Sequence, residues 1–312
     1  MKDNVALIGY GYWGKKYYNY LKKSEYFNLC FVFAPSFEKI RSLENPEKKF
    51  ISDIETILNN EDIPNVIIAT PINTHYEIAL KMLEHSKNIL IEKPITMRLK
   101  EALELNRISS EKNKIIETDY TYTYSAALDY VKKLIEKKHI GNIQSIEISL
   151  NQLGRFLPYN IYYLLGSHAL SILDLFLPID ECVFSPIPLM KNNDIVTSSV
   201  VTFYSSKHNC SGVMNLNLHS PIREKKIIIY GEKGTIYYTP LEKKVITITE
   251  YYRTEALTET ELIKATKFYE FDENNNLNLA LKNFHSVLHG KNSSNIKRSL
   301  SITGVLEKLC YE

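Results

Sequence analysis

The sequence predicts an α/β protein, with a doubly wound parallel sheet in an N-terminal domain and an open, mostly antiparallel sheet in a C-terminal α+β domain. The chain has 312 residues, which exceeds the roughly 250 to 300 residues that one hydrophobic core organises. Short apolar runs alternate with helical stretches up to about residue 120, a pattern typical of parallel sheets with crossover helices. Beyond it the apolar period changes toward two, which favours antiparallel strands. We therefore expect domains at 1–121 and 122–312.

The elements of the first domain begin with the apolar run Val5–Ile8, which fits a strand buried on both faces. A helical stretch to about Lys23 follows it. Further strands are predicted at 29–33, 50–51, 66–69, 88–91 and 114–118, and further helices at 37–43, 53–60, 75–85 and 99–112.

The second domain is predicted to start with a helix at 125–138. Six strands with period-two patterning follow, at 144–150, 195–203, 211–218, 226–230, 235–238 and 245–250. Turn residues at 217–221 and 231–234 indicate chain reversals. Two helices, at 277–288 and 299–311, complete the chain.

Composition excludes several classes of protein. The 38 basic and 36 acidic side chains leave a net charge of +2, whereas a nucleic-acid binder needs a basic excess or a basic stripe. No run reaches the roughly 18 apolar residues of a membrane span. The four cysteines lie far apart and indicate neither a disulfide framework nor a thiolate metal site. The start of the chain runs directly into Val5–Ile8 without a signal-peptide pattern, so we expect a cytoplasmic protein.

A glycine-rich motif follows the first strand. It reads G-x-G-x-x-G from Gly9 and leads into a helical pattern, as a dinucleotide-binding turn requires. Gly9 permits the tight turn, Gly11 lets the backbone approach a pyrophosphate, and Gly14 lets the helix pack against the strand. We expect a Rossmann-type site in which Tyr12 and Trp13 also contact the cofactor. A glycine-rich turn without a ligand is the alternative.

The acidic residue that holds the ribose hydroxyls in many such sites is missing. About 20 residues after the last glycine, the second strand ends in Ala34, Pro35 and Ser36. Without a carboxylate there, nothing repels a 2′-phosphate, and Ser36, Lys39 and Arg41 offer contacts to one. The sequence therefore predicts NAD or NADP as the cofactor, with a slight preference for NADP, and Ala34 and Ser36 as its neighbours.

A second motif, Glu92-Lys93-Pro94, follows another buried strand. It falls at the carboxyl edge of the predicted sheet, where open α/β sheets bind ligands. A lysine there can donate to a substrate oxygen and stabilise the charge that develops on it during hydride transfer. Taken alone, the motif also fits a surface lysine beside a strand-ending proline.

Four segments together resemble the glucose-fructose oxidoreductase, inositol dehydrogenase and rhizopine-catabolism (Gfo/Idh/MocA) family. These segments are the glycine loop, the turn 69–75 with its helix, the Glu92-Lys93-Pro94 motif, and the stretch 154–173 with Gly166-Ser167-His168. The segment 119–125 is similar to members from cell-surface sugar biosynthesis.

This resemblance implies a nicotinamide-dependent oxidoreductase that transfers hydride to or from a carbon of a sugar or nucleotide sugar. It implies that Lys93 is catalytic and that His168 is the general acid or base, a role that suits imidazole near neutral pH. It also implies further cofactor contacts at the second turn and the lysine motif: Thr70, Pro71, Asn73, His75 and Glu92.

The chain departs from the family pattern around His168. Leu164 stands where the family usually has an aspartate, and Ala169 replaces another aspartate found in many surface-sugar members. His168 thus lacks a carboxylate to orient it and stabilise its charged form. Two alternatives stay open: a catalytically weakened member that binds a nucleotide or sugar as a sensor or accessory protein, and a reductase of a non-sugar C=N or C=C bond.

Aromatic and polar residues near the two motifs are candidate substrate contacts. Tyr120, Tyr122 and Tyr124 share one face if their segment is extended. Packing is the alternative role for the tyrosines, and hydrogen bonding within the loop is the alternative for the polar residues. We assign four residues to the substrate: Tyr122, Arg155, Asn160 and Tyr163.

No metal site is expected. His285 and His289 have the i, i+4 spacing that can clasp zinc, but the sequence shows no third ligand. An open antiparallel sheet leaves one face to be covered, and pairing two such faces would make a homodimer or homotetramer. The expected partners are therefore a small-molecule substrate and further copies of the chain, with no nucleic acid and no membrane.

Overall fold

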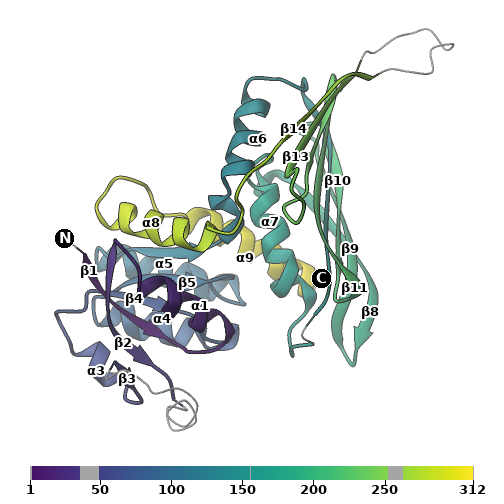
Figure 1. The fold of residues 1–312 in the computed structure, drawn as a ribbon. Coiled ribbons are helices and arrows are strands. Elements are labelled where there is room, and N and C mark those ends of the chain that lie inside the picture. Colours follow the sequence, from purple (N-terminus) through teal and green to yellow (C-terminus); the bar gives the residue numbers. More distant parts are fainter. Residues whose placement is uncertain (1, 36–48, 155, 252–262, 312) are drawn as a thin grey trace, which may run out of the picture. The chain divides into compact units, whose positions relative to one another are not determined.

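The structure is a computed structural model that divides into two units (Figure 1). The described residues are 2–35, 49–154, 156–251 and 263–311. The helix predicted at 37–43 lies outside them. The first unit comprises Met1–Thr121 and Asn275–Gly304, and the second comprises Tyr122–Asn274 and Val305–Glu312. Residues 275–304 thus return to the first unit, although the sequence assigned them to the second domain.

The first unit contains a parallel sheet of six strands in the order β3-β2-β1-β4-β5-β6. The strands are β1 (Asp3–Ile8), β2 (Phe27–Phe33), β3 (Phe50–Ile51), β4 (Asn65–Ile68), β5 (Asn88–Glu92) and β6 (Ile116–Asp119). This order reverses direction between β1 and β4, the point at which doubly wound sheets bind nucleotides. The predicted fold class is confirmed.

Helices cover both faces of this sheet. They are α1 (Tyr12–Leu21), α3 (Glu55–Leu58), α4 (His75–Glu84), α5 (Leu99–Glu111), α8 (Asn276–Leu288) and α9 (Ile296–Tyr311), with the 3₁₀ turn η1 (Ile72–Thr74). Alternate strand residues serve the two faces, as the pleat requires. Val5 and Leu7 pack in one core with side chains of α1 and α8, and Ala6 and Ile8 pack in another with side chains of α4 and α5.

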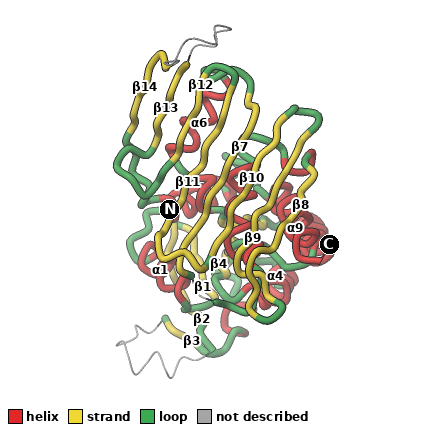
Figure 2. The backbone as a smooth tube through the Cα atoms, turned by 90° about the vertical axis from the view of Figure 1, so that its right-hand side faces the viewer, coloured by secondary structure: helices red, strands yellow, loops and turns green. Residues whose placement is uncertain are grey.

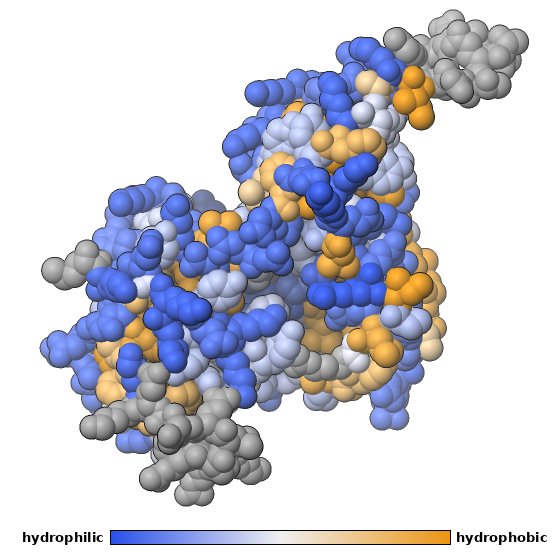
Figure 3. All heavy atoms as spheres, in the orientation of Figure 1, coloured by the Kyte–Doolittle hydropathy of each residue, from blue (hydrophilic) through white to orange (hydrophobic). Residues whose placement is uncertain are grey.

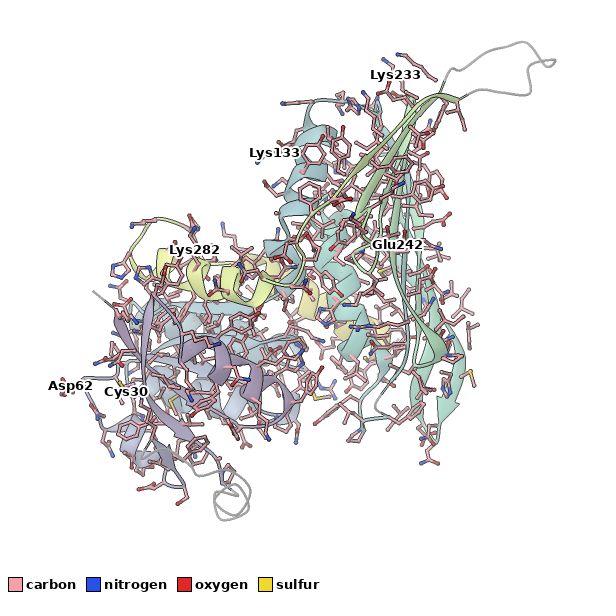
Figure 4. The ribbon with its side chains drawn as sticks, viewed as in Figure 1. Cys30, Asp62, Lys133, Lys233, Glu242 and Lys282 are labelled. Carbon is pink, nitrogen blue, oxygen red and sulfur yellow. The ribbon has the colours of Figure 1, made fainter. Side chains whose placement is uncertain are left out.

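Helix α8 completes the cover beside α1. Its buried face carries Leu281 and Phe284, which join the core that contains Val5 and Leu7. Lys282 projects from the exposed side of the same helix (Figure 4). The two faces of the first sheet are therefore closed by helices from both ends of the chain.

The second unit contains an eight-stranded sheet, drawn face-on in Figure 2, in the order β14-β13-β12-β11-β7-β10-β9-β8. Its strands are β7 (Ile143–Leu153), β8 (Val183–Asn192), β9 (Ile195–Ser205), β10 (Cys210–Asn217), β11 (His219–Gly231), β12 (Gly234–Tyr238), β13 (Ile246–Tyr251) and β14 (Ile263–Tyr269). Among the described strands of this sheet, only the β10–β7 pair is parallel. The mostly antiparallel sheet is confirmed.

The reversal predicted at 217–221 is not a hairpin. The chain turns between β10 and β11, but both strands pair with β7, which lies between them. The inner face of this sheet, with Ile146, Ile148 and Met214, is buried.

The helical elements of the second unit are η2 (Thr121–Tyr124), α6 (Ala126–Glu136), η3 (Tyr162–Gly166), α7 (Ser167–Leu173) and η4 (Ile179–Glu181). Ser125 caps α6, since its hydroxyl accepts a hydrogen bond from the Leu128 N–H. Across the described ranges, none of the helices has the length and apolar character to span a membrane.

Candidate active site

The glycine loop joins β1 to α1 at the point where the strand order reverses. Gly9 has φ +100°, and a Cβ there would lie 2.6 Å from the Ala69 carbonyl oxygen at the end of neighbouring β4. A Cβ at Gly14 would lie 2.2 Å from the carbonyl oxygen of Gly9. Both positions therefore need glycine for the fold itself. At Gly11, by contrast, a Cβ would meet nothing within 4 Å.

This open space at Gly11 fits a bound dinucleotide. Gly11 is the N-cap of α1, and no side chain caps this helix start. The N–H groups that begin a helix favour the binding of an anion. The hypothesis that this loop binds a phosphate explains why residue 11 is glycine, because a Cβ there would occupy the space that a pyrophosphate needs.

A positive charge lies beside the loop, contributed by a residue that sequence reasoning did not select. The Lys16 ammonium is 4.6 Å from the centre of the Tyr12 ring and 4.2 Å from the centre of the Trp13 ring. Tyr12 is exposed and Trp13 is partly buried. A lysine one turn into the helix was the available signal in the sequence.

The second predicted turn follows β4 at the same edge. Pro71 and Asn73 are exposed, and Thr70 is partly buried. The Thr74 hydroxyl lies 2.8 Å from the Thr70 hydroxyl and 2.7 Å from the Pro71 carbonyl oxygen. These hydrogen bonds stabilise the 3₁₀ turn η1. Asn73 is left at the surface, near the end of β4, which lies beside Gly9.

His75 connects this turn to the lysine motif. Its ring is buried, with Nδ1 2.9 Å from the Pro94 carbonyl oxygen and Nε2 3.0 Å from the Thr70 carbonyl oxygen. Burial lowers the pKa of His75, and a neutral ring donates to only one of the two carbonyls. Whichever tautomer is present, the ring lies between the segment that follows β4 and the segment that follows β5.

The end of β2 supplies Ala34, which is buried beside the loop. The Gly9 N–H donates to the Phe33 carbonyl oxygen at 2.9 Å, so the end of β2 lies next to the start of the loop. Ser36, Lys39 and Arg41 fall outside the described residues, and the preference for NADP stays a prediction.

Four side chains form a buried cluster at the carboxyl ends of β5 and β6. Tyr17 of α1 donates a hydrogen bond to the Asp119 carboxylate. Glu92 is buried, its Oε2 accepts a hydrogen bond from the Lys93 N–H at 3.3 Å, and its Oε1 has no hydrogen-bond partner within the described part of the chain. Lys93 is partly buried. Sequence reasoning missed Tyr17 and Asp119; the position of Asp119 at a strand end was the available signal.

Burial shifts the pKa values of Glu92 and Lys93 in this cluster. It raises the pKa of Glu92, and the neighbouring charge of Asp119 raises the pKa of Glu92 further. Burial also lowers the pKa of Lys93, against the attraction of Glu92 and Asp119 for the protonated amine. Lys93 can therefore exchange a proton closer to neutral pH than an exposed lysine.

A Glu92→Gln substitution should change the pH dependence of stability. Folding raises the pKa of Glu92 from 4.5 to about 8. The protonated Glu92 carboxyl therefore contributes its full stabilisation of the folded state below pH 4.5, and this stabilisation is lost as the pH rises through 8. Glutamine does not titrate, so the free energy of unfolding of the variant relative to the wild type should rise by at least about 1 kcal/mol between pH 5 and 8. Urea unfolding at both pH values measures this, and parallel pH curves for the two proteins would contradict it.

His168 lies in α7 of the second unit. Its ring packs edge-on against Tyr122, with ring centroids 5.2 Å apart, and the Lys225 ammonium is 4.8 Å from the centre of the Tyr122 ring. Ala169 is fully buried and Leu164 is partly buried. The predicted substrate contact Tyr122 and the predicted general acid or base His168 are thus brought together, whereas Lys93 belongs to the other unit.

One of the remaining predicted substrate contacts has a structural partner. The Asn160 side-chain oxygen accepts a hydrogen bond from the Val196 N–H at 2.8 Å. Tyr163 is buried, and Arg155 lies outside the described residues. Substrate contact by these three residues stays a prediction.

One expectation about the tyrosines is wrong. Tyr120, Tyr122 and Tyr124 were placed on one face of an extended segment, but residues 121–124 form the 3₁₀ turn η2. Side chains two apart do not share a face in a helix with three residues per turn. Tyr120 is fully buried.

Comparison with known proteins agrees with this geometry. Residues 4–120 match the model of a family, GFO_IDH_MocA, described as "Oxidoreductase family, NAD-binding Rossmann fold". The chain is 26% identical to the uncharacterized oxidoreductase YhhX of Escherichia coli over 254 residues, which is 75% of this chain and 71% of that protein. It is 32% identical to levoglucosan dehydrogenase of Pseudarthrobacter phenanthrenivorans over 162 residues, which is 46% of this chain and 39% of that enzyme.

Among solved structures, the chain resembles KijD10, a 3-ketoreductase from Actinomadura kijaniata in complex with TDP-benzene and NADP. The TM-score is 0.84 at 12% identity, over 98% of this chain and 96% of that one. At this identity the likeness shows a shared fold.

The parallel sheet, the glycine loop and the family match define the class of the protein as an NAD(P)-dependent oxidoreductase. Residues 4–120, which carry the glycine loop and the parallel sheet, are the part of the chain that matches the Gfo/Idh/MocA family model.

Proposed function

We propose that this oxidoreductase transfers hydride between its nicotinamide cofactor and a carbon of a sugar or a nucleotide-linked sugar. The single observation that carries the proposal is the placement of Lys93, next to buried Glu92 and Asp119 at the sheet edge that also holds the glycine loop. The names of levoglucosan dehydrogenase and of the 3-ketoreductase support a sugar as the substrate.

In this proposal the residues of the glycine loop and the second turn hold the cofactor. The N–H groups at the start of α1 bind the pyrophosphate, and Gly11 lets the backbone approach it. Tyr12, Trp13 and Gly14 flank that contact, and Ala34, Thr70 and Asn73 lie at neighbouring strand ends. When bound, the nicotinamide supplies or accepts the hydride.

Lys93 handles the proton of the reacting oxygen. Its Nζ donates to a carbonyl that becomes a hydroxyl, or accepts the proton of a hydroxyl that becomes a carbonyl. The lowered pKa of Lys93 suits both directions, because both its ammonium and its amine forms become accessible nearer to neutral pH. Glu92 and Asp119 favour the ammonium and position it.

His168 and Tyr122 contribute to the sugar site of the second unit. The Tyr122 ring offers an apolar face, and His168 offers a polar edge that can exchange a proton with a sugar hydroxyl. Leu164 and Ala169 leave His168 without the carboxylates of many family members, so we assign the principal proton transfer to Lys93.

An activity screen tests the proposal. NAD⁺ and NADP⁺ are each combined with a panel of sugars, anhydrosugars, inositols and nucleotide sugars, and the absorbance of the reduced nicotinamide is followed. We expect turnover with at least one sugar. Cofactor binding without turnover on the panel would support the sensor or accessory alternative, and turnover only with imines or activated alkenes would support the non-sugar reductase.

We further propose that the exposed face of the eight-stranded sheet pairs with a second copy of the chain. Val183 of β8 lies opposite Tyr204 of β9, and Ile187 lies opposite Val200, so these residues share one face. Val183, Ile187 and Tyr204 are exposed, and Figure 3 shows apolar side chains gathered where β8 and β9 lie. Sedimentation velocity should show a dimer or tetramer, and monomer alone at micromolar concentration would contradict this proposal.

A cytoplasmic location is also part of the proposal. All four cysteines are free thiols in the structure, which is compatible with a reducing compartment.

A further inference from the structure

Three side chains of metal-ligating type meet in the first unit, outside the nucleotide site. Asp3 lies at the start of β1, and His285 and His289 lie one turn apart on and just after α8 (Figure 1). The Asp3 Oδ2 atom is 3.0 Å from the His289 Nε2 atom and 3.7 Å from the His285 Nε2 atom. The two imidazole rings have centroids 4.5 Å apart.

The three groups are mounted on rigid elements. The Asp3 N–H donates to the Tyr26 carbonyl oxygen at 2.9 Å, which fixes the start of β1 against β2. His285 packs against Tyr26, with centroids 5.4 Å apart. One residue earlier, Phe284 is fully buried and stacks on Phe27. The positions of the ligating groups therefore follow from the packing of α8 against the sheet.

The spacing suits one small ion. Ligand atoms about 2.0 to 2.1 Å from a tetrahedral zinc ion lie about 3.4 Å from one another. The two distances from Asp3 bracket this value, and the ligand atoms of all three residues lie within 4.8 Å of one another. Small side-chain rotations that bring the two imidazoles closer would complete three coordination positions.

The lowered pKa of His285 is compatible with the ligand role that the geometry indicates. Burial lowers the pKa of His285, and the neighbouring charge of His289 lowers it further, against the attraction of Asp3. A neutral imidazole retains the lone pair that a metal needs. Lys291 and the N-terminal amine are nearby cations that oppose a bound ion.

Access is open from solvent. The exposed fractions of the side chains are 47% for His289, 19% for His285 and 25% for Asp3. Imidazole nitrogens with a carboxylate oxygen suit zinc and its neighbours among the transition metals, whereas magnesium and calcium prefer all-oxygen sites.

We propose that Asp3, His285 and His289 bind a zinc-class divalent ion that clamps the start of β1 to the end of α8. Solvent supplies the fourth ligand. The clamp joins the first strand of the chain to a helix near its end, and the proposal is independent of the proposed catalytic function.

Zinc binding to the tag-free 312-residue protein tests this proposal. The chain is treated with a chelator, dialysed, and titrated with Zn²⁺ by calorimetry and thermal unfolding, without a nicotinamide cofactor. We expect one ion per chain and a rise in Tm of roughly 5 °C or more at a free zinc concentration about 100 times Kd. Mg²⁺ at the same concentration should not raise the Tm.

Variants locate the site. His289→Ala should weaken zinc binding by at least about tenfold. His85→Ala is the matched control, because His85 follows α4 as His289 follows α8 and is likewise exposed; it should bind zinc as the wild type does. If His289→Ala does not fold, Asp3→Asn replaces it, with the same expected loss. The proposal would be overturned if the wild type showed no saturable zinc binding, or if His289→Ala or its replacement Asp3→Asn bound zinc as tightly as the wild type.

Discussion

Replacing Lys93 by alanine should reduce kcat by roughly 10²- to 10⁴-fold, the usual contribution of a positioned acid or base. The affinity for the reduced cofactor should change little, because the glycine loop and the second turn make the proposed phosphate and ribose contacts. Steady-state kinetics on a substrate found in the screen measures the first quantity, and a fluorescence titration measures the second. The result separates proton transfer from cofactor binding.

Two further variants control for charge and for surface effects. Lys93→Arg keeps the positive charge but does not release a proton near neutral pH, so it should not restore kcat. Lys100→Ala removes an exposed lysine of α5 and should leave the kinetics unchanged. If Lys93→Ala retained wild-type turnover, the proton chemistry would have to be assigned to another group.

The second large effect concerns Gly11, the N-cap of α1, and Gly14 in the first turn of this helix. Gly14→Ala should destabilise the fold by about 1 to 3 kcal/mol, because the new Cβ would lie 2.2 Å from the Gly9 carbonyl oxygen. Gly11→Ala should change the free energy of unfolding by less than about 1 kcal/mol, since its Cβ would meet nothing within 4 Å. The same Cβ would fill the space proposed for the pyrophosphate, so cofactor affinity should fall by at least about tenfold.

Urea unfolding and cofactor titration of both variants measure these effects. The two substitutions add the same methyl group three residues apart, which makes each the control for the other. A Gly11→Ala protein that binds NADH and NADPH as tightly as the wild type would place the pyrophosphate elsewhere.

The sequence predicted the parallel sheet well because its strands are buried on both faces. Such strands are continuous apolar runs, as in Val5–Ile8, and they contrast with the helices between them. The two missed strands, β8 and β14, are the edges of the second sheet. Pro186 and Pro188 interrupt the pattern of β8, and in β14 the charged residues Lys264 and Lys267 fall on opposite faces of the strand. Edge strands are solvent-exposed, so neither acquires a clear alternation.

Site residues were predictable where a local motif marks them. The glycine loop and Lys93 each follow a buried strand, so parallel-sheet geometry alone brings them to one edge. Tyr17 was not predictable, because its contact with Asp119 spans 102 residues. Asp3, the third residue of the proposed metal site, was not predictable for the same reason, because Asp3 and His289 are 286 residues apart. Contacts of this kind depend on the packing of α1 and α8, which the local pattern does not encode.

The most direct test of the central claim, that the glycine loop binds a nicotinamide dinucleotide, uses the one tryptophan of the chain. Trp13 lies in that loop, so selective tryptophan excitation during parallel titrations with NADH and NADPH reports on cofactor bound beside it. We predict saturable quenching of Trp13 and sensitised nicotinamide emission, both strongly weakened in Gly11→Ala. Folded protein free of carried-over ligand that shows no energy transfer with either cofactor would contradict the claim.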